Sequence, residues 1–187
     1  RINPEEVVTV GTQVSGRIVQ LYVKANDAVK KDQLLAEIDP TLPQAQLDQS
    51  KSSMENNYYI MELAERNFNR AKALFAKDYV ARVDMERAQQ DYRTSKNAYD
   101  VARTQYERDK ANVGYTKIHS PVDGVIIESK VSKGQTMAAS FEAPEMFKIA
   151  RDLTKMVIDV GLTEADIGQV KVGLPVRFNV DAYPQKE

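Results

Sequence analysis

Large apolar residues recur every seven positions through the middle of this 187-residue chain. The stretch between Pro43 and Gly114 contains no other proline or glycine, so nothing in it breaks a helix. A sustained seven-residue period is typical of a left-handed coiled coil. The large positions are Leu47, Met54, Met61, Phe68 and Phe75, followed by Met85, Tyr92, Tyr99, Tyr106 and Val113.

The period breaks at about residues 76–84, which predicts two helices folded back on each other as an antiparallel hairpin over residues 41–114. Folding the chain at this break places Phe68 opposite Tyr92 and Phe75 opposite Met85. Tyr99 joins them in the predicted hairpin seam. Small or polar residues come three positions after most of the large ones and also face one another, for example Ala71 and Ala88 or Ser50 and Asp109.

The predicted tip of the hairpin carries two apolar residues, Tyr79 and Val80, where there is no core for them to enter. An apolar tip on a long stalk is a candidate docking surface. The alternative is that the two side chains only hold the turn together. Asp84 is expected to cap the second helix through its side-chain oxygen.

The segments before and after the helical insert carry two halves of one β-motif. Gly16 precedes Asn26 by ten residues, and Gly124 precedes Gly134 by ten residues. Valine and isoleucine runs punctuated by Gly, Asn and Asp indicate short strands with tight turns. The halves are predicted at 11–40 and 115–150, with Asn26 and Asp32 in left-handed backbone conformations. One small β-domain that carries a projecting hairpin favours a connector over a catalyst.

A further β-region is predicted over residues 151–187, with strands at 156–160 and 176–180 and a short helix starting near Thr163. These strands are too few to close a barrel, so the region is predicted to be part of one. Residues 1–10 are expected to supply one of its strands.

The composition removes several classes of function. The formal net charge of −1 does not fit a nucleic-acid binder, and the absence of cysteine excludes disulfides and thiolate metal sites. No phosphate loop, nucleophile motif or metal-ligand spacing is present, and the single histidine, His119, is expected to be structural. The sequence therefore predicts no enzyme activity and no cofactor. Because the chain starts at Arg1, it is interpreted as a piece of a longer protein.

Several segments resemble the HlyD family of periplasmic adaptors, also called membrane fusion proteins, and most closely its MacA-like branch. The resemblance implies a mixed α and β, elongated fold: an antiparallel coiled-coil α-hairpin inserted in a split lipoyl-like β-sandwich, plus a partial β-barrel. The segments that carry it are 10–16, 21–23, 29–33, 38–40, 140–144, 152–156, 164–168 and 180–184.

The resemblance also implies a function and partners. The family members are hexameric funnels that link an inner-membrane ABC transporter, here MacB-like, to a TolC-like outer-membrane channel in drug export. The expected location is the periplasm, with anchoring to the inner membrane through a segment absent from this chain.

The resemblance assigns the site residues of the family to the matching positions of this chain. The tip signature of the family is Arg, then Leu, then Ser, and this chain has Arg70, Leu74 and Ala81 at those positions. Together with Tyr79 and Val80, these three residues form the expected docking tip for the outer channel. The turn at 132–135 matches a family loop that narrows the pore, which implies pore-facing roles for Lys133 or Gln135, although an ordinary turn remains the alternative.

Other functions stay open at this point. The adaptor could serve a proton-driven pump of the RND or MFS type, or a type I protein secretion system. A biotinylated or lipoylated carrier domain is a further alternative, but helices replace the turn that would carry its lysine. A purely structural coiled coil would leave the repeated β-halves unexplained.

Overall fold

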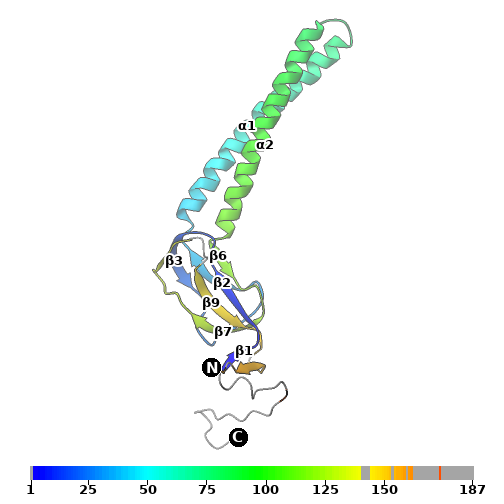
Figure 1. Ribbon diagram of the computed structural model, residues 1–187. Coiled ribbons are helices and arrows are strands. Elements are labelled where there is room, and N and C mark those ends of the chain that lie inside the picture. The colour runs from blue at the N-terminus through cyan, green and yellow to red at the C-terminus, as the bar shows by residue number, and fades with distance from the viewer. Residues whose placement is uncertain (1, 140–143, 153, 159, 162–172, 174–187) are drawn as a thin grey trace, which may run out of the picture.

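The computed structural model describes residues 2–139, 144–152, 154–158, 160–161 and 173. The molecule is elongated: a helical hairpin projects from one end of a pair of β-sheets, and the chain's N-terminal strand lies at the other end (Figure 1). This is the mixed α and β architecture that the sequence predicted.

Helix α1 spans Thr41–Phe75 and helix α2 spans Arg82–Gly114, and the two run antiparallel along the hairpin. The connection covers residues 76–81, so it is shorter than the predicted 76–84. Every large and small position that the heptad pattern assigns to the interface is buried or half-buried. Leu42 and Pro43 lie in the first turn of α1, where a proline costs no helical hydrogen bond.

Two four-stranded antiparallel sheets pack at the base of the hairpin. In strand order, one sheet contains β2 (Val7–Gly11), β9 (Glu145–Ala150), β7 (Gly124–Ser129) and β4 (Ala28–Val29). The other contains β6 (Lys117–His119), β5 (Leu34–Ile38), β3 (Gly16–Leu21) and β8 (Thr136–Met137).

The two halves of the β-motif exchange strands. The short strand of the first half, β4, pairs with β7 of the second half, and β8 of the second half pairs with β3 of the first. The turns follow the same exchange: the Asn26 amide donates to the Ile126 carbonyl at 2.7 Å, and the Gly134 amide donates to the Ile18 carbonyl at 2.8 Å. The repeat predicted from sequence is therefore a pseudo-twofold unit that is complete only when both halves are present.

The core lies between the sheets and uses equivalent residues of both halves. Its equivalent pairs are Ile18 with Ile126, Val23 with Val131, and Val29 with Met137, and all six are buried. The motif glycines are required for packing: a Cβ on Gly16 would lie 2.5 Å from Cγ2 of Ile38, and a Cβ on Gly124 would meet the Ala150 carbonyl oxygen at 2.3 Å. A larger residue at Gly124 would require a backbone shift, and one at Gly16 would require the buried Ile38 side chain to move.

The N-terminal segment forms two strands instead of the single strand expected at 1–10. Strand β1 (Ile2–Pro4) pairs with β10 (Met156–Ile158), whereas β2 joins the sandwich through β9. β1 thus pairs with the first strand predicted for the second β-region, and the assignment of residues 1–10 to a partial barrel stays a prediction. The helix expected near Thr163 and the strand expected at 176–180 lie outside the described residues.

Candidate docking surface at the hairpin tip

The end of α1 is closed by a Schellman-type cap. The Tyr79 amide donates to the Leu74 carbonyl at 3.0 Å, and the Asp78 amide donates to the Phe75 carbonyl at 3.0 Å. Asp78 has φ of 58°, the left-handed conformation that glycine usually supplies at this position. This cap fixes the backbone of Tyr79 against Leu74, so two of the predicted docking residues belong to one rigid turn.

The start of α2 differs from the prediction. The helix begins at Arg82, and the residue at the N-cap is Ala81, which has an extended backbone and no side chain that can cap. The expectation that Asp84 caps the helix was wrong, because the helix starts two residues before it. Asp84 instead lies in the first turn, where a negative charge is favourable near the positive end of the helix dipole. The Asp84 amide is bonded to the Ala81 carbonyl at 3.1 Å.

The docking tip, defined as Arg70, Leu74, Tyr79, Val80 and Ala81, presents both polar and apolar surface. The Tyr79 side chain is 73% exposed, so it does not pack into the turn. Leu74 and Val80 are half-buried, and Arg70 and Ala81 are exposed. A neighbouring valine of α2, Val83, is also exposed. Tyr79 is therefore exposed on a backbone that the cap holds in place, and the role of the tip as a docking surface stays a prediction.

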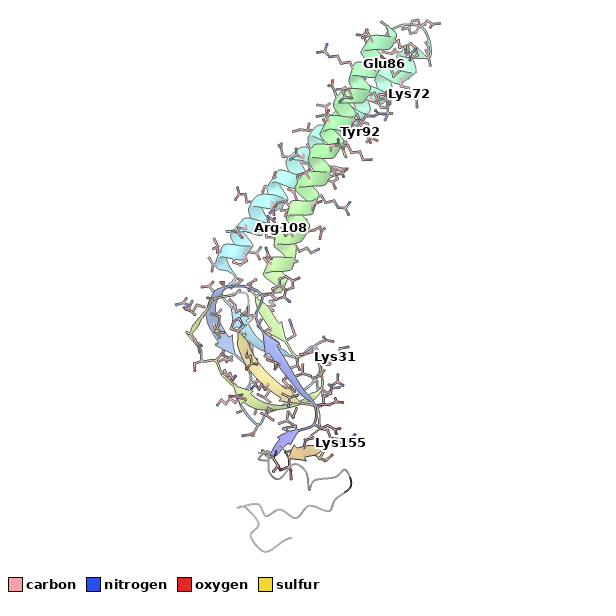
Figure 2. The ribbon with its side chains drawn as sticks, viewed as in Figure 1. Lys31, Lys72, Glu86, Tyr92, Arg108 and Lys155 are labelled. Carbon is pink, nitrogen blue, oxygen red and sulfur yellow. The ribbon has the colours of Figure 1, made fainter. Side chains whose placement is uncertain are left out.

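The seam below the tip holds the two helices together through aromatic contacts. The Phe68 and Tyr92 rings stack with centroids 6.1 Å apart and planes at 8°, as the predicted fold-back requires. Tyr92 also donates to Oε1 of Glu65 at 3.4 Å. Tyr99 packs edge-on against Tyr58, a residue that the heptad pattern does not place in the seam. Phe75 and Met85 are half-buried. Figure 2 shows Tyr92 on α2 between Glu86 near the tip and Arg108 near the base.

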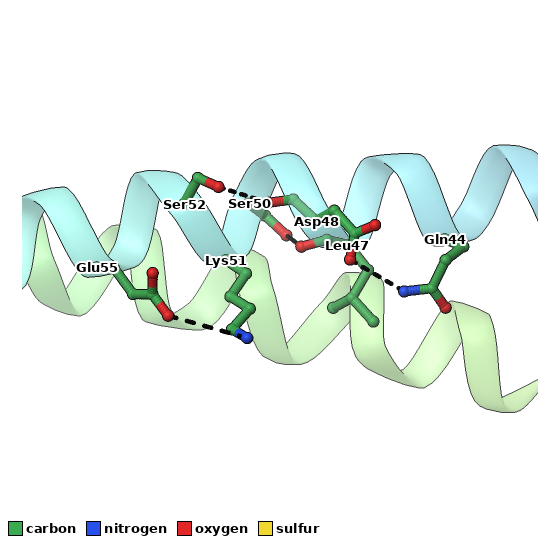
Figure 3. A network of polar contacts seen from close by, with 7 residues as sticks. All are labelled: Gln44, Leu47, Asp48, Ser50, Lys51, Ser52 and Glu55. Atoms are coloured by element: carbon green, nitrogen blue, oxygen red, sulfur yellow. Dashed lines mark hydrogen bonds and ion pairs between the residues drawn. The ribbon is translucent and has the colours of Figure 1, made fainter.

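The base of the hairpin is polar. Asp109 is buried within the seam and accepts hydrogen bonds from Nε2 of Gln105 at 3.0 and 2.9 Å. On α1 the polar side chains are engaged with their own helix: Ser50 donates to the Leu47 carbonyl, Ser52 donates to the Asp48 carbonyl, and Lys51 pairs with Glu55 (Figure 3). The buried polar side chains of the described hairpin thus lie toward its base.

A carboxylate joins the hairpin to the sheets. Oδ1 of Asp39 accepts from the Thr41 hydroxyl at 2.6 Å and the Thr41 amide at 3.1 Å, and Oδ2 lies 3.6 Å from Nη2 of Arg17. The hydrogen bonds from Thr41, aided by the charge of Arg17, lower the pKa of Asp39 below its usual value. This arrangement ties the first residue of α1 to the end of β5 and to β3.

The predicted pore turn is held by its own side chains. Oε1 of Gln135 accepts from the Ser132 amide at 3.0 Å, and Nζ of Lys133 donates to Oε1 of Gln20 at 2.8 Å. The equivalent turn of the first half uses Asp27 in the same way, accepting from the Lys24 amide at 2.7 Å. The side chain of Gln135 is therefore explained by turn geometry, and a pore role for Lys133 or Gln135 stays a prediction.

Within the described part of the chain, no group of three or more His, Cys, Asp or Glu side chains is placed to hold a metal ion. Nor does that part include a helix of the length and apolar character needed to cross a membrane.

Comparison with known proteins decides the family. The family model described as the barrel-sandwich hybrid domain of RND membrane fusion proteins matches residues 6–147. The chain belongs to this family. The split sandwich with its inserted hairpin is thus the domain that gives the family model its description.

Individual membrane fusion proteins are similar to this chain over nearly its whole length. The chain is 32% identical to the macrolide export protein MacA of Yersinia pestis, over 96% of this chain and 52% of that protein. It is 32% identical to the pyoverdine export membrane fusion protein PvdR of Pseudomonas aeruginosa, over 95% of this chain and 49% of that protein. A crystal structure of a MacA–MexA chimera containing the Pseudomonas aeruginosa MexA hairpin superposes with a TM-score of 0.67 at 36% identity, covering 91% of this chain and 54% of the chimera. The chain therefore spans about half the length of these curated relatives.

Proposed function

We propose that this chain is the central portion of a periplasmic adaptor that joins an inner-membrane ABC transporter, similar to MacB, to a TolC-like outer-membrane channel. The observation that carries the proposal is the hairpin itself. Its 35-residue first helix reaches about 50 Å from the sheets and ends in a rigid turn that exposes Tyr79 to solvent. A long, capped stalk with an apolar tip serves to reach a distant partner.

Assembly into a hexameric funnel belongs to the same proposal, because one hairpin alone encloses no conduit. The sandwich would then form a ring near the inner membrane, with the segment that anchors the adaptor to that membrane lying outside this chain. The adaptor acts as a connector, without a catalytic site or a cofactor. Its relatives are named for the export of different compounds, a macrolide and pyoverdine, so the cargo is expected to be chosen by the transporter.

A second candidate is an adaptor for a proton-driven RND pump, and the description of the matched family model favours it. Adaptors of MFS pumps and of type I secretion systems are the remaining members of this class. Purification of the full-length adaptor with its inner-membrane partner distinguishes them. Co-purification of an ATPase whose rate rises with adaptor concentration supports the ABC type, whereas co-purification of a proton-driven pump contradicts it.

Charge placed at the tip tests the proposed docking role. Leu74→Asp should abolish drug export while leaving the fold intact, because an unpaired carboxylate would be buried against the channel. Ala73→Asp places the same group one residue away on an exposed position of α1 and should leave export largely unchanged. Arg70→Asp and its exposed neighbour Asn69→Asp form a second matched pair. Normal export by both Leu74→Asp and Arg70→Asp would show that docking lies elsewhere.

A further inference from the structure

A polar groove lies between the two helices near the base of the hairpin. Its volume is about 640 Å³, which is within the range of pockets that hold small molecules, and every residue that lines it is polar. We call it the basal groove; the lining residues that matter here are Gln46, Gln49 and Ser50 on α1 and Gln105, Arg108 and Asp109 on α2. Both sets have the spacing i, i+3, i+4, so each helix turns one polar face toward the groove.

The basal groove contains a buried carboxylate. Asp109 is 6% exposed, so its charge is largely removed from bulk water. Both of its oxygens accept from the same group, Nε2 of Gln105, at 3.0 and 2.9 Å. The two oxygens of a carboxylate offer about four acceptor positions, so a single amide leaves acceptor capacity unused. A cation that donates hydrogen bonds to a buried carboxylate stabilises it strongly.

The basic residue next to this carboxylate is a weak partner for it. Nε of Arg108 lies 3.9 Å from Oδ1 of Asp109, which is too far for a hydrogen bond. The Arg108 side chain is 69% exposed, whereas that of Asp109 is 8% exposed, so water screens the guanidinium and reduces the strength of the pair. Figure 2 shows Arg108 near the base of the hairpin. The Asp109 carboxylate is therefore available to a cation that enters the groove.

Neutral acceptors on the facing helix suit the remaining hydrogens of an ammonium group. Gln46 and Gln49 line the groove from α1, and each carries an amide oxygen that can accept. The Ser50 hydroxyl donates to the Leu47 carbonyl at 3.1 Å, so its own oxygen is left as an acceptor (Figure 3). An ammonium group has three donors and no acceptor. One buried carboxylate opposite neutral acceptors thus matches the donors of an ammonium group.

From the buried carboxylate and the acceptors opposite it, we propose that the basal groove binds a small organic cation through a primary ammonium group. Asp109 accepts the charge-assisted hydrogen bond, and Gln46 and Gln49 accept from the remaining ammonium hydrogens. The ligand thereby bridges α1 and α2. The site is separate from the docking tip, because Ser50 and Leu74 are 24 residues apart on α1, about 36 Å along the helix.

A diamine and its neutral analogue test the charge of the ligand. The probe is 1,5-diaminopentane, titrated at neutral pH and low salt into the full-length adaptor and followed by ligand-detected NMR. The diol 1,5-pentanediol has the same length and no charge, so it should bind about tenfold more weakly or less. Equal binding of the diamine and the diol would overturn the assignment of a cation site.

Removal of the buried charge tests the position of the site. Asp109→Asn keeps the size of the side chain and should weaken binding of the diamine by about tenfold or more. The matched control is Asp100→Asn, which removes an exposed negative charge from the same helix and should change the affinity by less than about twofold. Equal losses in the two variants would show that the diamine responds only to overall charge, and would overturn the site.

Removal of the neighbouring base should act in the opposite direction. Arg108→Gln takes a competing cation away from Asp109 and should tighten binding of the diamine by about two- to fivefold. Arg103→Gln, at an exposed position of the same helix, should leave the affinity nearly unchanged. Because Arg108 is exposed, its replacement leaves the seam intact. Weaker binding by Arg108→Gln would make Arg108 a donor to the ligand, which contradicts a cationic ligand.

The bridging of the two helices supplies a second readout. A saturating concentration of the diamine should raise the melting temperature followed by helical circular dichroism, because a ligand that binds only the folded state stabilises it. Asp109→Asn should lose this shift. If the unaltered adaptor shows neither saturable binding nor a shift, the proposal is overturned. The adaptor assignment would still stand, because the docking tip is tested separately by its crosslinks to the outer channel.

Discussion

Among the described residues, three other than glycine have left-handed backbone conformations: Asn26 with φ of 72°, Asp32 with 63° and Asp78 with 58°. The first two were predicted: Asn26 matches Gly134 of the other half, and Asp32 occupies a turn position where glycine would be the easy choice. Asp78 was not predicted, since a single turn at a hairpin tip offers no second copy for comparison. All three are residue types that tolerate this region better than most.

The same comparison between the two halves explains the hydrogen bond of the Gln135 side chain. Its side chain holds the amide of Ser132 as Asp27 holds that of Lys24, and the two acceptors are 108 positions apart, as are Gly16 and Gly124. This relation is visible in the sequence once the offset is applied to side chains. Thr12 and Ser120 obey it too, because each is buried and bonds the carbonyl two residues on.

The missing cap at Ala81 gives a prediction for one residue. Ala81→Ser should stabilise the hairpin by about 1 kcal/mol, because a hydroxyl at the N-cap can accept from a free amide of the first turn of α2. Urea unfolding of the chain measures the change. Ala98→Ser, at an exposed position inside α2, should give a small loss, about 0.5 kcal/mol, through lower helix propensity. Equal effects of the two serines would contradict the assignment of Ala81 as the cap.

At the scale of elements, the hairpin depends on aromatic layers near its upper half and on polar layers at its base. Phe68 and Tyr92 stack in the seam, whereas Ser50 and Asp109 are buried polar residues nearer the sheets. Buried polar groups fix the register of helices at some cost in stability. The stability of the hairpin is therefore expected to come mainly from its upper layers. These run from the layer of Met61 and Tyr99 to the layer of Phe75 and Met85.

Truncating one aromatic layer tests this distribution. Phe68→Ala should lower the free energy of unfolding by about 1–3 kcal/mol, less than the cost for a fully buried ring because Phe68 is half-buried. Tyr79→Ala removes a ring of similar size that is 73% exposed and should change stability by less than about 0.5 kcal/mol. Thermal unfolding followed by helical circular dichroism compares the two. An unchanged melting temperature in Phe68→Ala would show that the seam is misassigned.

The junction between hairpin and sheets should be sensitive to acid. The pKa of Asp39 is lowered in the folded protein, chiefly by its hydrogen bonds from Thr41, so its contribution is complete above the ordinary carboxyl pKa near 4. That contribution is lost as the pH falls through the lowered value.

Replacing this carboxylate should remove its share of the acid sensitivity. Stability of Asp39→Asn should therefore fall less steeply between about pH 4 and pH 2 than that of the unaltered chain. Asp100→Asn, on the exposed surface of α2, serves as the control for removing one negative charge. Identical acid profiles for Asp39→Asn and the unaltered chain would contradict this role.

Element type and order could be predicted from the sequence, because each rests on a local period: seven for the helices and a ten-residue spacing for the β-halves. The strand exchange between halves could not, since β4 and β7 pair through contacts about 96 residues apart that no local pattern encodes. The start of α2 was missed for a similar reason. Asp84 is the nearest good capping residue in the sequence, yet the helix begins at Arg82, whose guanidinium pairs with Glu86 at 2.7 Å.

At the scale of the whole molecule, the fold separates two kinds of surface. The sheets are compact, with a core shared by both halves of the repeat, and the hairpin projects from them as a long stalk (Figure 1). The chain belongs to the RND membrane fusion protein family and is 32% identical to MacA of Yersinia pestis over 96% of its length. The tip is the part of the stalk that is proposed to contact another protein.

The most direct test of the adaptor account is crosslinking from the tip in cells that carry candidate outer-membrane channels. Single cysteines at Arg70, Tyr79 and Ala81 of the full-length protein provide the reporters, and the 187 residues contain no native cysteine. Cysteine at Asn69 is the matched exposed control on α1. The account predicts crosslinks to a TolC-like channel from the tip positions and few or none from residue 69. An absence of channel crosslinks from all three tip positions, with the protein folded and present in the periplasm, would contradict it.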